Sequence, residues 1–406
     1  MHRALPCGVL LLAACGNEAR SPTTRTIGGQ PGLDAGGTEA GETAGAMAVA
    51  GSGVGGGGAG TAGVGGDRAG EGGLASGGAG ASAVVTQPWP GPDDVQTVDA
   101  ADLFTDNVSG LTYEPATAAA PAVLWAVANI PGRLHRLVSS GGSFASDTAG
   151  GWEAGKLLQF PSGQSAADAE GVTLAATSAD GLYVASEHDN AAASTSRQSI
   201  LRYDVAAAGA SLTATHEWNV TALLPPSGAN LGIEAITWVA DQYLLEKSFF
   251  DEAAGRDYAP DDYGEHAAGL FFVGVEQSGM IYGFALDHTD GVATLVASIR
   301  SPFAGVMSLE YDRDLGQLWF GCDETCGNPS GILDVDTADG SPSRGRFTLR
   351  RLFARPSSLP NSNHEGIAIG PESECTVGFK PFYWADDADV AGHTLRRDAI
   401  PCGPAF

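Results

Sequence analysis

Short runs in which apolar and polar residues alternate recur along the chain from about residue 107 onward. A period of two predicts a β-strand, because successive side chains of a strand point to opposite faces of a sheet. Five of these runs begin with a polar or small residue and lie about 60 to 70 residues apart. They are residues 107–115, 168–176, 232–240, 305–313 and 363–371. We interpret them as the first strands of five repeated units.

Further strands follow the first strand in each unit. The predicted second strands are rich in aromatic residues and mostly end on a polar or acidic residue; they are 123–129, 181–187, 242–248, 317–323 and 381–387. The predicted third strands are 132–138, 199–205, 279–286, 331–337 and 393–400. Four units have a fourth strand, at 156–162, 214–220, 294–300 and 347–353. Asp-Gly pairs at 180–181, 290–291 and 339–340 are typical of the hairpin turns between such strands.

The strand pattern predicts an all-β fold, a β-propeller of five four-stranded blades. The fifth unit lacks its fourth strand, and residues 94–104, ahead of the first unit, are able to supply it. Closing the ring in this way leaves few exposed sheet edges. Residues 249–279 make the third unit longer and are expected to be an insertion on one face. The apolar run 269–275 inside it leaves six blades as the alternative.

The N-terminus predicts export. Residues 1–14 combine a basic start with a short apolar run, which has the shape of a signal peptide and is too short to span a bilayer. The segment Leu12-Ala13-Ala14-Cys15 resembles the lipobox of bacterial lipoproteins. That resemblance implies a lipid on Cys15, a membrane as partner, and, with Gly16 next, an outer-membrane lipoprotein of the cell envelope, periplasmic or surface-exposed. The alternative is a plain signal peptide with an unmodified cysteine.

Composition divides the mature chain into two parts. Residues 15–88 are mostly Gly, Ala, Ser and Thr and bury too little apolar surface to fold, so they predict a disordered tether. Residues 89–406 hold all seven Trp and form the predicted propeller domain. The net charge of −27 disfavours nucleic acid as a partner and suits divalent cations or solubility. We expect a monomer.

Four cysteines remain after Cys7 and Cys15. An even number in an exported chain indicates two disulfides, with three possible connectivities. Proximity in the sequence favours the pairs Cys322–Cys326 and Cys375–Cys402. A metal site on the segment Cys322–Cys326 is the rival interpretation.

Acidic residues recur where each first strand begins. In a propeller this strand lines the central channel, so the aligned residues are expected at one mouth of it; they are Ser109, Glu170, Glu234, Met307 and Glu365. The ends of the predicted second strands add Asn129, Glu187, Glu246, Asp323 and Asp387. Carboxylates that converge raise one another's pKa and oppose folding. A hard divalent cation relieves the repulsion, and calcium fits best. The alternative is that the glutamates only accept backbone N–H groups from the next blade.

Three motifs, Asp168–Leu174 with Gly181–Glu187, Asn363–Ile369 and Tyr383–Asp387, resemble the esterase-like/phytase-like β-propeller family, and the first also resembles the SdiA-regulated propeller family. The resemblance extends from about residue 95 onward. It implies a secreted, calcium-binding propeller with phosphoester or ester hydrolysis. Carried over residue by residue, it implies a site of Asp168, Glu170, Glu187, Asn363, Glu365, Asp386 and Asp387. Ser109 and Met307 depart from the pattern.

Two functions follow from these residues. The first is metal-dependent hydrolysis of a phosphorylated or ester small-molecule substrate, with Glu365 and Glu170 as catalytic carboxylates and His364 or His188 moving a proton. The second is a non-catalytic propeller that binds a ligand or protein of the envelope. In that case the insertion supplies contact residues, Tyr258, Asp261 and Tyr263.

Overall fold

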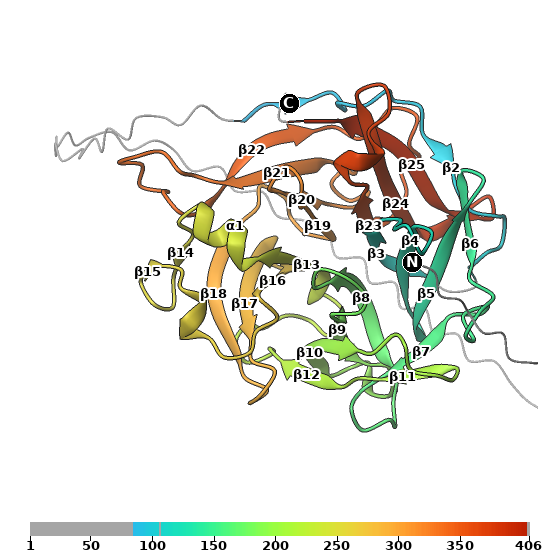
Figure 1. Cartoon of the computed structure of the whole chain (residues 1–406), viewed down its shortest axis with the longest axis horizontal. Helices are drawn as coiled ribbons and strands as arrows, with labels where there is room; N and C mark the ends of the chain where they lie inside the picture. The colour runs from blue at the N-terminus through green and yellow to red at the C-terminus, as the bar shows by residue number, and fades with distance from the viewer. Residues whose placement is uncertain (1–83, 105–106, 404–406) are drawn as a thin grey trace, which may run out of the picture. The chain divides into compact units, whose positions relative to one another are not determined.

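The structure is a computed structural model that describes residues 84–104 and 107–403. Its strands form five main sheets arranged in a ring, each a blade whose first strand lies innermost (Figure 1). The predicted signal peptide, Cys15 and the tether up to residue 83 lie outside the described residues. Within the described part, no helix is long and apolar enough to cross a membrane.

The blades follow the chain in order. Blade 1 contains β3 (Val108–Glu114), β4 (Val123–Asn129), β5 (Gly132–Ser140) and β7 (Lys156–Gln159), with β6 (Ser143–Ser146) and β11 (Ser211–Thr213) added. Blade 2 contains β8 (Ala167–Leu174), β9 (Leu182–Asp189), β10 (Ser196–Tyr203) and β12 (His216–Asn219). Blade 3 contains β13 (Ile233–Ala240), β16 (Gly269–Val275), β17 (Met280–Leu286) and β18 (Ala293–Arg300).

The last two blades combine strands from residues 308–401 with two short strands from residues 84–104. Blade 4 contains β19 (Ser308–Asp312), β20 (Gln317–Gly321), β21 (Ser330–Val335) and β22 (Phe347–Phe353), with β1 (Thr86–Gln87) added in parallel to β22. Blade 5 contains β23 (His364–Ile369), β24 (Phe379–Val390), β25 (His393–Pro401) and β2 (Gln96–Thr97). The pairing of Gln96 with Arg397 confirms that the segment 94–104 closes the last blade.

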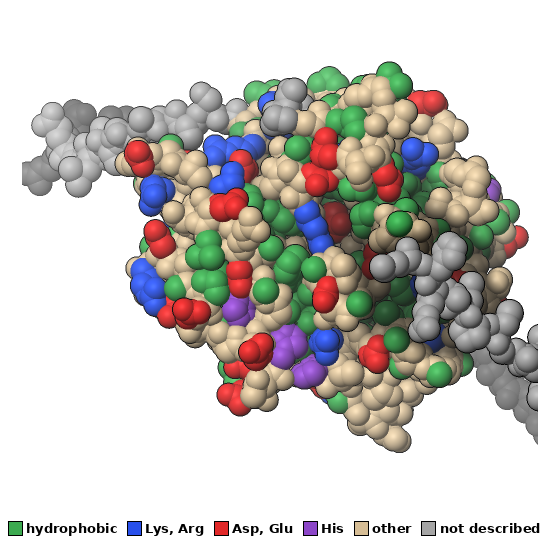
Figure 2. Space-filling view, in the orientation of Figure 1, with side chains coloured by type: hydrophobic (Ala, Val, Ile, Leu, Met, Phe, Trp, Pro, Cys, Tyr) green, Lys and Arg blue, Asp and Glu red, His purple; other side chains and the backbone are tan. Residues whose placement is uncertain are grey.

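The third unit corrects one strand prediction. Residues 242–248 are not a strand: the helix α1 (Asp241–Glu246) occupies most of them, with Leu244 buried and Gln242 bonded to Glu246 one turn later at 2.9 Å. The second strand of blade 3 is β16, in which all seven residues are buried. A strand buried on both faces shows no alternation, which hid it inside the predicted insertion. The blade count is therefore five. Figure 2 shows the face that carries α1, where acidic and basic side chains are interspersed.

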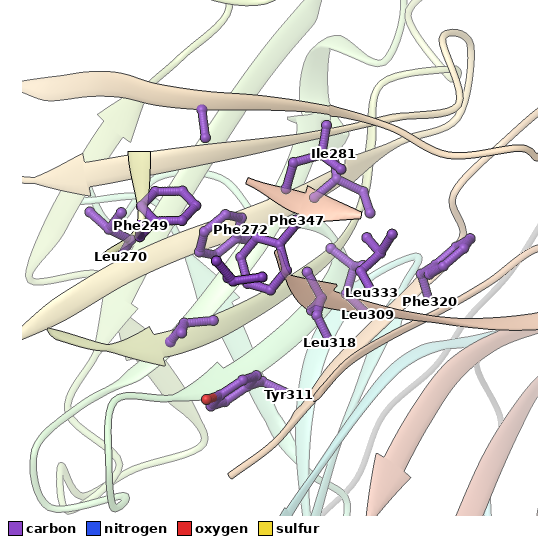
Figure 3. Close-up of a cluster of buried hydrophobic side chains, with 14 of the residues drawn as sticks. Phe249, Leu270, Phe272, Ile281, Leu309, Tyr311, Leu318, Phe320, Leu333 and Phe347 are labelled. Atoms are coloured by element: carbon purple, nitrogen blue, oxygen red, sulfur yellow. The ribbon is translucent and has the colours of Figure 1, made fainter. Parts of the chain in front are cut away.

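The hydrophobic core consists of five clusters, one at each junction between neighbouring blades. Figure 3 shows the junction of blades 3 and 4, where Phe272 and Ile281 pack with Leu318 and Phe347. Strand alternation explains how one blade serves two junctions. On β4, Trp125 packs toward blade 2 and its neighbour Leu124 packs toward blade 5. This packing holds the inner strands around one axis.

Both predicted disulfides are confirmed. Cys322–Cys326 closes a short loop that follows β20, with Cα atoms 5.9 Å apart. Cys375–Cys402 joins the segment before β24 to the end of β25, with Cα atoms 6.1 Å apart. The first bond uses both thiols that a metal site on this loop would need.

Candidate metal site

The inner strands of four blades contain a β-bulge near their first residue. On β8, for example, Ala169 pairs with Ser186 and Gly171 pairs with Ala185, so Glu170 is the extra residue. A bulge redirects the side chain of the extra residue. The four extra residues are Ser109, Glu170, Glu234 and Glu365. In blade 4, Met307 donates its N–H to Gly321, the residue that pairs with Ser308, so Met307 occupies the same position.

Glycines that follow the bulges let the inner strands approach each other. A Cβ atom on Gly171 would lie 2.7 Å from the backbone nitrogen of Ile236 in blade 3. A Cβ atom on Gly366 would lie 2.9 Å from the backbone nitrogen of Leu111 in blade 1. Neither distance leaves room for a side chain, so glycine brings the bulges, and with them the glutamates, close to the axis.

The structure brings the three predicted glutamates of the mouth together. Glu170, Glu234 and Glu365 line one cavity on the axis, together with Ser109. They are only 4%, 6% and 8% exposed. The cavity has a volume of about 10 Å³, which holds about one water molecule. Among the described residues that line it there is no Lys or Arg.

A second tier of polar residues lies at the ends of the second strands. Asp387 donates its N–H to Asn363 O at 2.8 Å, and Glu276 donates to Gly232 O at 2.9 Å. The full tier is Asn129, Glu187, Glu276, Asp323 and Asp387. Glu276 takes the place predicted for Glu246, which lies on α1. The sequence signal for Glu276 was its position directly after the apolar run 269–275.

Residues beside the bulges and beside the second tier connect the two groups. Asn363 donates from Nδ2 to Glu365 Oε1 at 2.7 Å and to Asp387 Oδ2 at 3.3 Å. His188 Nδ1 lies 2.9 Å from Asp168 Oδ2, and ligand atoms of Asp168, Glu187 and His188 all lie within 4.8 Å of one another. The backbone N–H of Gly232 donates to Glu187 Oε1.

His364 and Asp386 belong to a separate group. His364 Nε2 lies 2.9 Å from Pro360 O, and its Nδ1 lies 3.6 Å from Asp386 Oδ1. Asp386 also accepts a hydrogen bond from Ser362 Oγ at 2.8 Å. Alternation along β24 explains why Asp386 meets His364 whereas Asp387 meets Asn363. Burial lowers the pKa of His364 to about 4 and raises that of Asp386 to about 7.

The electrostatics of the mouth oppose ionisation. Burial, and then the carboxylates of neighbouring residues, raise the pKa of Glu170 and of Glu234 well above its ordinary value. The pKa of Glu365 is raised in the same way, by burial and by the carboxylate of Asp387. Burial raises the pKa of Glu187 to about 7. A positive charge placed among these groups would lower the pKa of each of them.

Several buried oxygen atoms at the mouth have no hydrogen-bond partner among the described residues. They are Asn129 Oδ1, Asp168 Oδ1, Asn363 Oδ1, Glu365 Oε2 and Asp387 Oδ1. Every one of them is an acceptor, and buried acceptors are normally paired. Carboxylate and amide oxygens that lack a donor are the type of ligand that hard cations prefer. The site therefore fits a divalent cation chemically.

The arrangement of sheets defines the class of protein, a five-bladed β-propeller. No protein family matches the sequence, and no curated protein is similar to it. One similar solved structure is a Thermus thermophilus protein assigned as an oxidoreductase (glucose dehydrogenase), with 10% identity, a TM-score of 0.39, and coverage of 75% of this chain and 99% of that one. Another, from Bacteroides thetaiotaomicron and of unknown function, has 11% identity, a TM-score of 0.36 and 75% coverage of both chains. Similarities this low carry no conclusion about activity.

Proposed function

We propose that the channel mouth binds a calcium ion and that the protein is a calcium-binding β-propeller anchored in the cell envelope through Cys15. The observation that carries the proposal is twofold: buried oxygens of the mouth residues have no hydrogen-bond partner among the described residues, and three buried glutamates line one cavity on the axis. Calcium accepts six to eight oxygen ligands in flexible geometry, which suits ligands that come from several blades.

The proposed ligands are carboxylates of the bulges and of the second tier, together with Asp168 and Asn363, which lie two residues before a bulge glutamate. They are Asp168, Glu170, Glu187, Glu234, Asn363, Glu365 and Asp387. Asp386 is not among them, because its partners are Ser362 and His364. Ligands from blades 2, 3 and 5 would let one ion link segments that are far apart in the sequence. The ion would then stabilise the closed ring as well as the mouth.

The test is calcium binding by the purified full-length chain after treatment with a chelator. We expect calorimetry to give about one tightly bound calcium per chain, and Glu365→Gln to weaken it at least about tenfold. The matched control is Glu265→Gln, which removes an exposed carboxylate of the insertion and should leave the affinity unchanged. Equal affinities for the two variants would contradict the proposal.

A second candidate function is hydrolysis of a phosphoester or ester. It is favoured by one observation, a depression of about 190 Å³ beside the mouth, lined by Glu276, Met307 and Asp323. Calcium would supply the charge that attracts an oxyanion and acidifies bound water. Of the two predicted histidines, His188 is the better candidate for holding a proton, because its Nδ1 faces Asp168 whereas the ring of His364 is bound at Pro360.

The two functions are separated by p-nitrophenyl phosphate and p-nitrophenyl acetate, assayed with and without calcium. Calcium-dependent turnover that His188→Gln abolishes, with calcium affinity retained, supports the hydrolase. Calcium binding without turnover supports the non-catalytic binding propeller.

A further inference from the structure

A second pocket lies at the end of the channel opposite the carboxylates. On β13, Glu234 lies at the mouth, and Trp238 and Ala240 line the second pocket. Ala240 lies six positions after Glu234 along this extended strand, a distance of about 20 Å. The pocket is therefore independent of the proposed calcium site. Its remaining walls come from α1 and from the turn between β19 and β20.

The pocket has the size and lining of a small-molecule site. Its volume is about 360 Å³, within the range of about 300–1,000 Å³ that is usual for such sites. Trp238, Tyr243 and Tyr311 contribute aromatic walls. The face that carries α1 is hollowed near its centre (Figure 2).

One wall of the pocket is fixed in place by bonds that cross the channel. Arg313, which follows β19 in blade 4, donates from Nη1 to Ala176 O at 2.7 Å and from Nη2 to Leu174 O at 2.6 Å, both in or next to blade 2. Its guanidinium carbon lies 5.1 Å from the centre of the Trp238 ring. A wall that is already ordered loses little conformational entropy when a ligand binds.

The polar groups around the aromatic walls identify the ligand chemistry. Lys247 and Arg313 bring two positive charges, and Glu246 and Asp314 bring two negative charges. A simple anion or cation would gain from one pair and be repelled by the other. Hydroxyl groups both donate and accept, so they match a pocket that offers both donors and acceptors. C–H groups of a sugar ring match the aromatic walls.

We propose that this pocket binds a neutral saccharide of one or two rings. Three further contacts support this assignment, because they leave donors and acceptors free at the rim and hold an aromatic wall in place. Lys247 Nζ lies 3.8 Å from Asp334 Oδ1 and so keeps donors available. Gln242 donates to Glu246 Oε1 at 2.9 Å, which leaves the second carboxylate oxygen of Glu246 to accept. Tyr243 is held by its own hydrogen bond to Asp334 Oδ1 at 2.9 Å.

The test is calorimetric titration of the full-length chain with glucose, N-acetylglucosamine, maltose and cellobiose, with glutamate and inorganic phosphate as charged probes. We expect at least one sugar to bind with a Kd below ~10 mM. Gln242→Trp, which fills the pocket from an exposed position on α1, should abolish that binding. Lys247→Ala should weaken it at least about threefold.

The matched control is Arg350→Ala, which removes a similarly exposed cation from β22 that does not line the pocket. It should leave sugar binding unchanged. The proposal is overturned if none of the sugars binds, if only a charged probe binds, or if Gln242→Trp leaves sugar binding intact. A circular-dichroism spectrum of each variant establishes that it is folded.

Discussion

Glu234 illustrates what a single buried carboxylate does to the folded chain. Its side chain lies on the axis, its pKa is raised well above the ordinary value by burial and by Glu170, and it lies among other acidic groups. In the absence of a cation, ionisation of Glu234 therefore opposes folding. The same charge becomes favourable once a cation is bound.

We predict that Glu234→Gln makes the metal-free protein more stable near pH 8, by on the order of 1–2 kcal/mol. The glutamine keeps the shape of the side chain and removes the charge. Urea unfolding in the presence of a chelator measures the effect, and the same variant should bind calcium more weakly. Glu265→Gln should change neither quantity. A metal-free Glu234→Gln protein that is less stable than the parent at pH 8 would contradict the electrostatic account.

The same carboxylates determine how stability depends on pH. A carboxyl group whose pKa is higher in the folded than in the unfolded chain binds more protons when folded, so the free energy of unfolding falls as pH rises between the two values. For Glu187 this window runs from 4.5 to about 7. We therefore predict that the metal-free protein loses stability as pH rises through this window, and that saturating calcium removes the loss. Urea midpoints across the window, with chelator and with calcium, measure it.

At the scale of the element, the bulge followed by glycine is the unit that places the acidic side chains. We predict that Gly171→Ala lowers the free energy of unfolding by about 1–3 kcal/mol, because the new Cβ meets backbone atoms of Ala235 and Ile236. Gly305→Ala is the control, since nothing lies closer than 3.3 Å to its Cβ. Thermal unfolding compares them. Equal losses would indicate that close approach of the inner strands does not depend on glycine.

The disulfide loop after β20 is a second element that shapes the mouth. It holds Asp323, whose Oδ1 accepts the N–H of Thr325 at 3.0 Å and whose charge helps to raise the pKa of Glu365. We predict that replacing Cys322 and Cys326 by Ser weakens calcium binding several-fold. Replacing Cys375 and Cys402 by Ser should reduce stability without changing calcium affinity. If the first replacement left calcium affinity unchanged and the second weakened it, Asp323 would not contribute to the site.

The elements also show what the sequence was able to predict. Four of the five second strands, and the glutamates near the start of the first strands, followed from alternation and spacing, because both reflect local geometry. The segment 242–248 was misassigned because Tyr243 and Leu244 mimic a strand over a few residues. The bulge, and the opposite directions of Asp386 and Asp387, depend on pairing across β23 and β24, which spacing alone does not reveal. The segment around β1 was hidden by its position at the end of the Gly/Ala-rich region.

At the scale of the whole molecule, the ring is closed by residues that precede the first blade. Trp89 packs against Trp319, Phe382 and Trp384 and donates to Asp398 Oδ2 at 2.9 Å. Strands β1 and β2 pair with blades 4 and 5. These contacts join the N-terminal segment to the two blades that are last in the chain.

We predict that a chain beginning at residue 99 is less stable than one beginning at residue 84 by more than about 3 kcal/mol, the lower end of the usual loss for a buried Trp. The longer chain should match the full-length protein. Urea unfolding of the three chains measures the differences. If the two shortened chains are equally stable, the N-terminal pairings do not support the ring.

Ring closure also sets the order of events when the protein is made. Gln96 emerges from the ribosome about 300 residues before its partner Arg397. Until that partner arrives, blade 5 does not exist and the first blade has nothing to pack against on one side. Contacts so distant in sequence form slowly. A nascent chain would therefore remain open until Arg397 has been made, and its first blade would keep one apolar side exposed during that time.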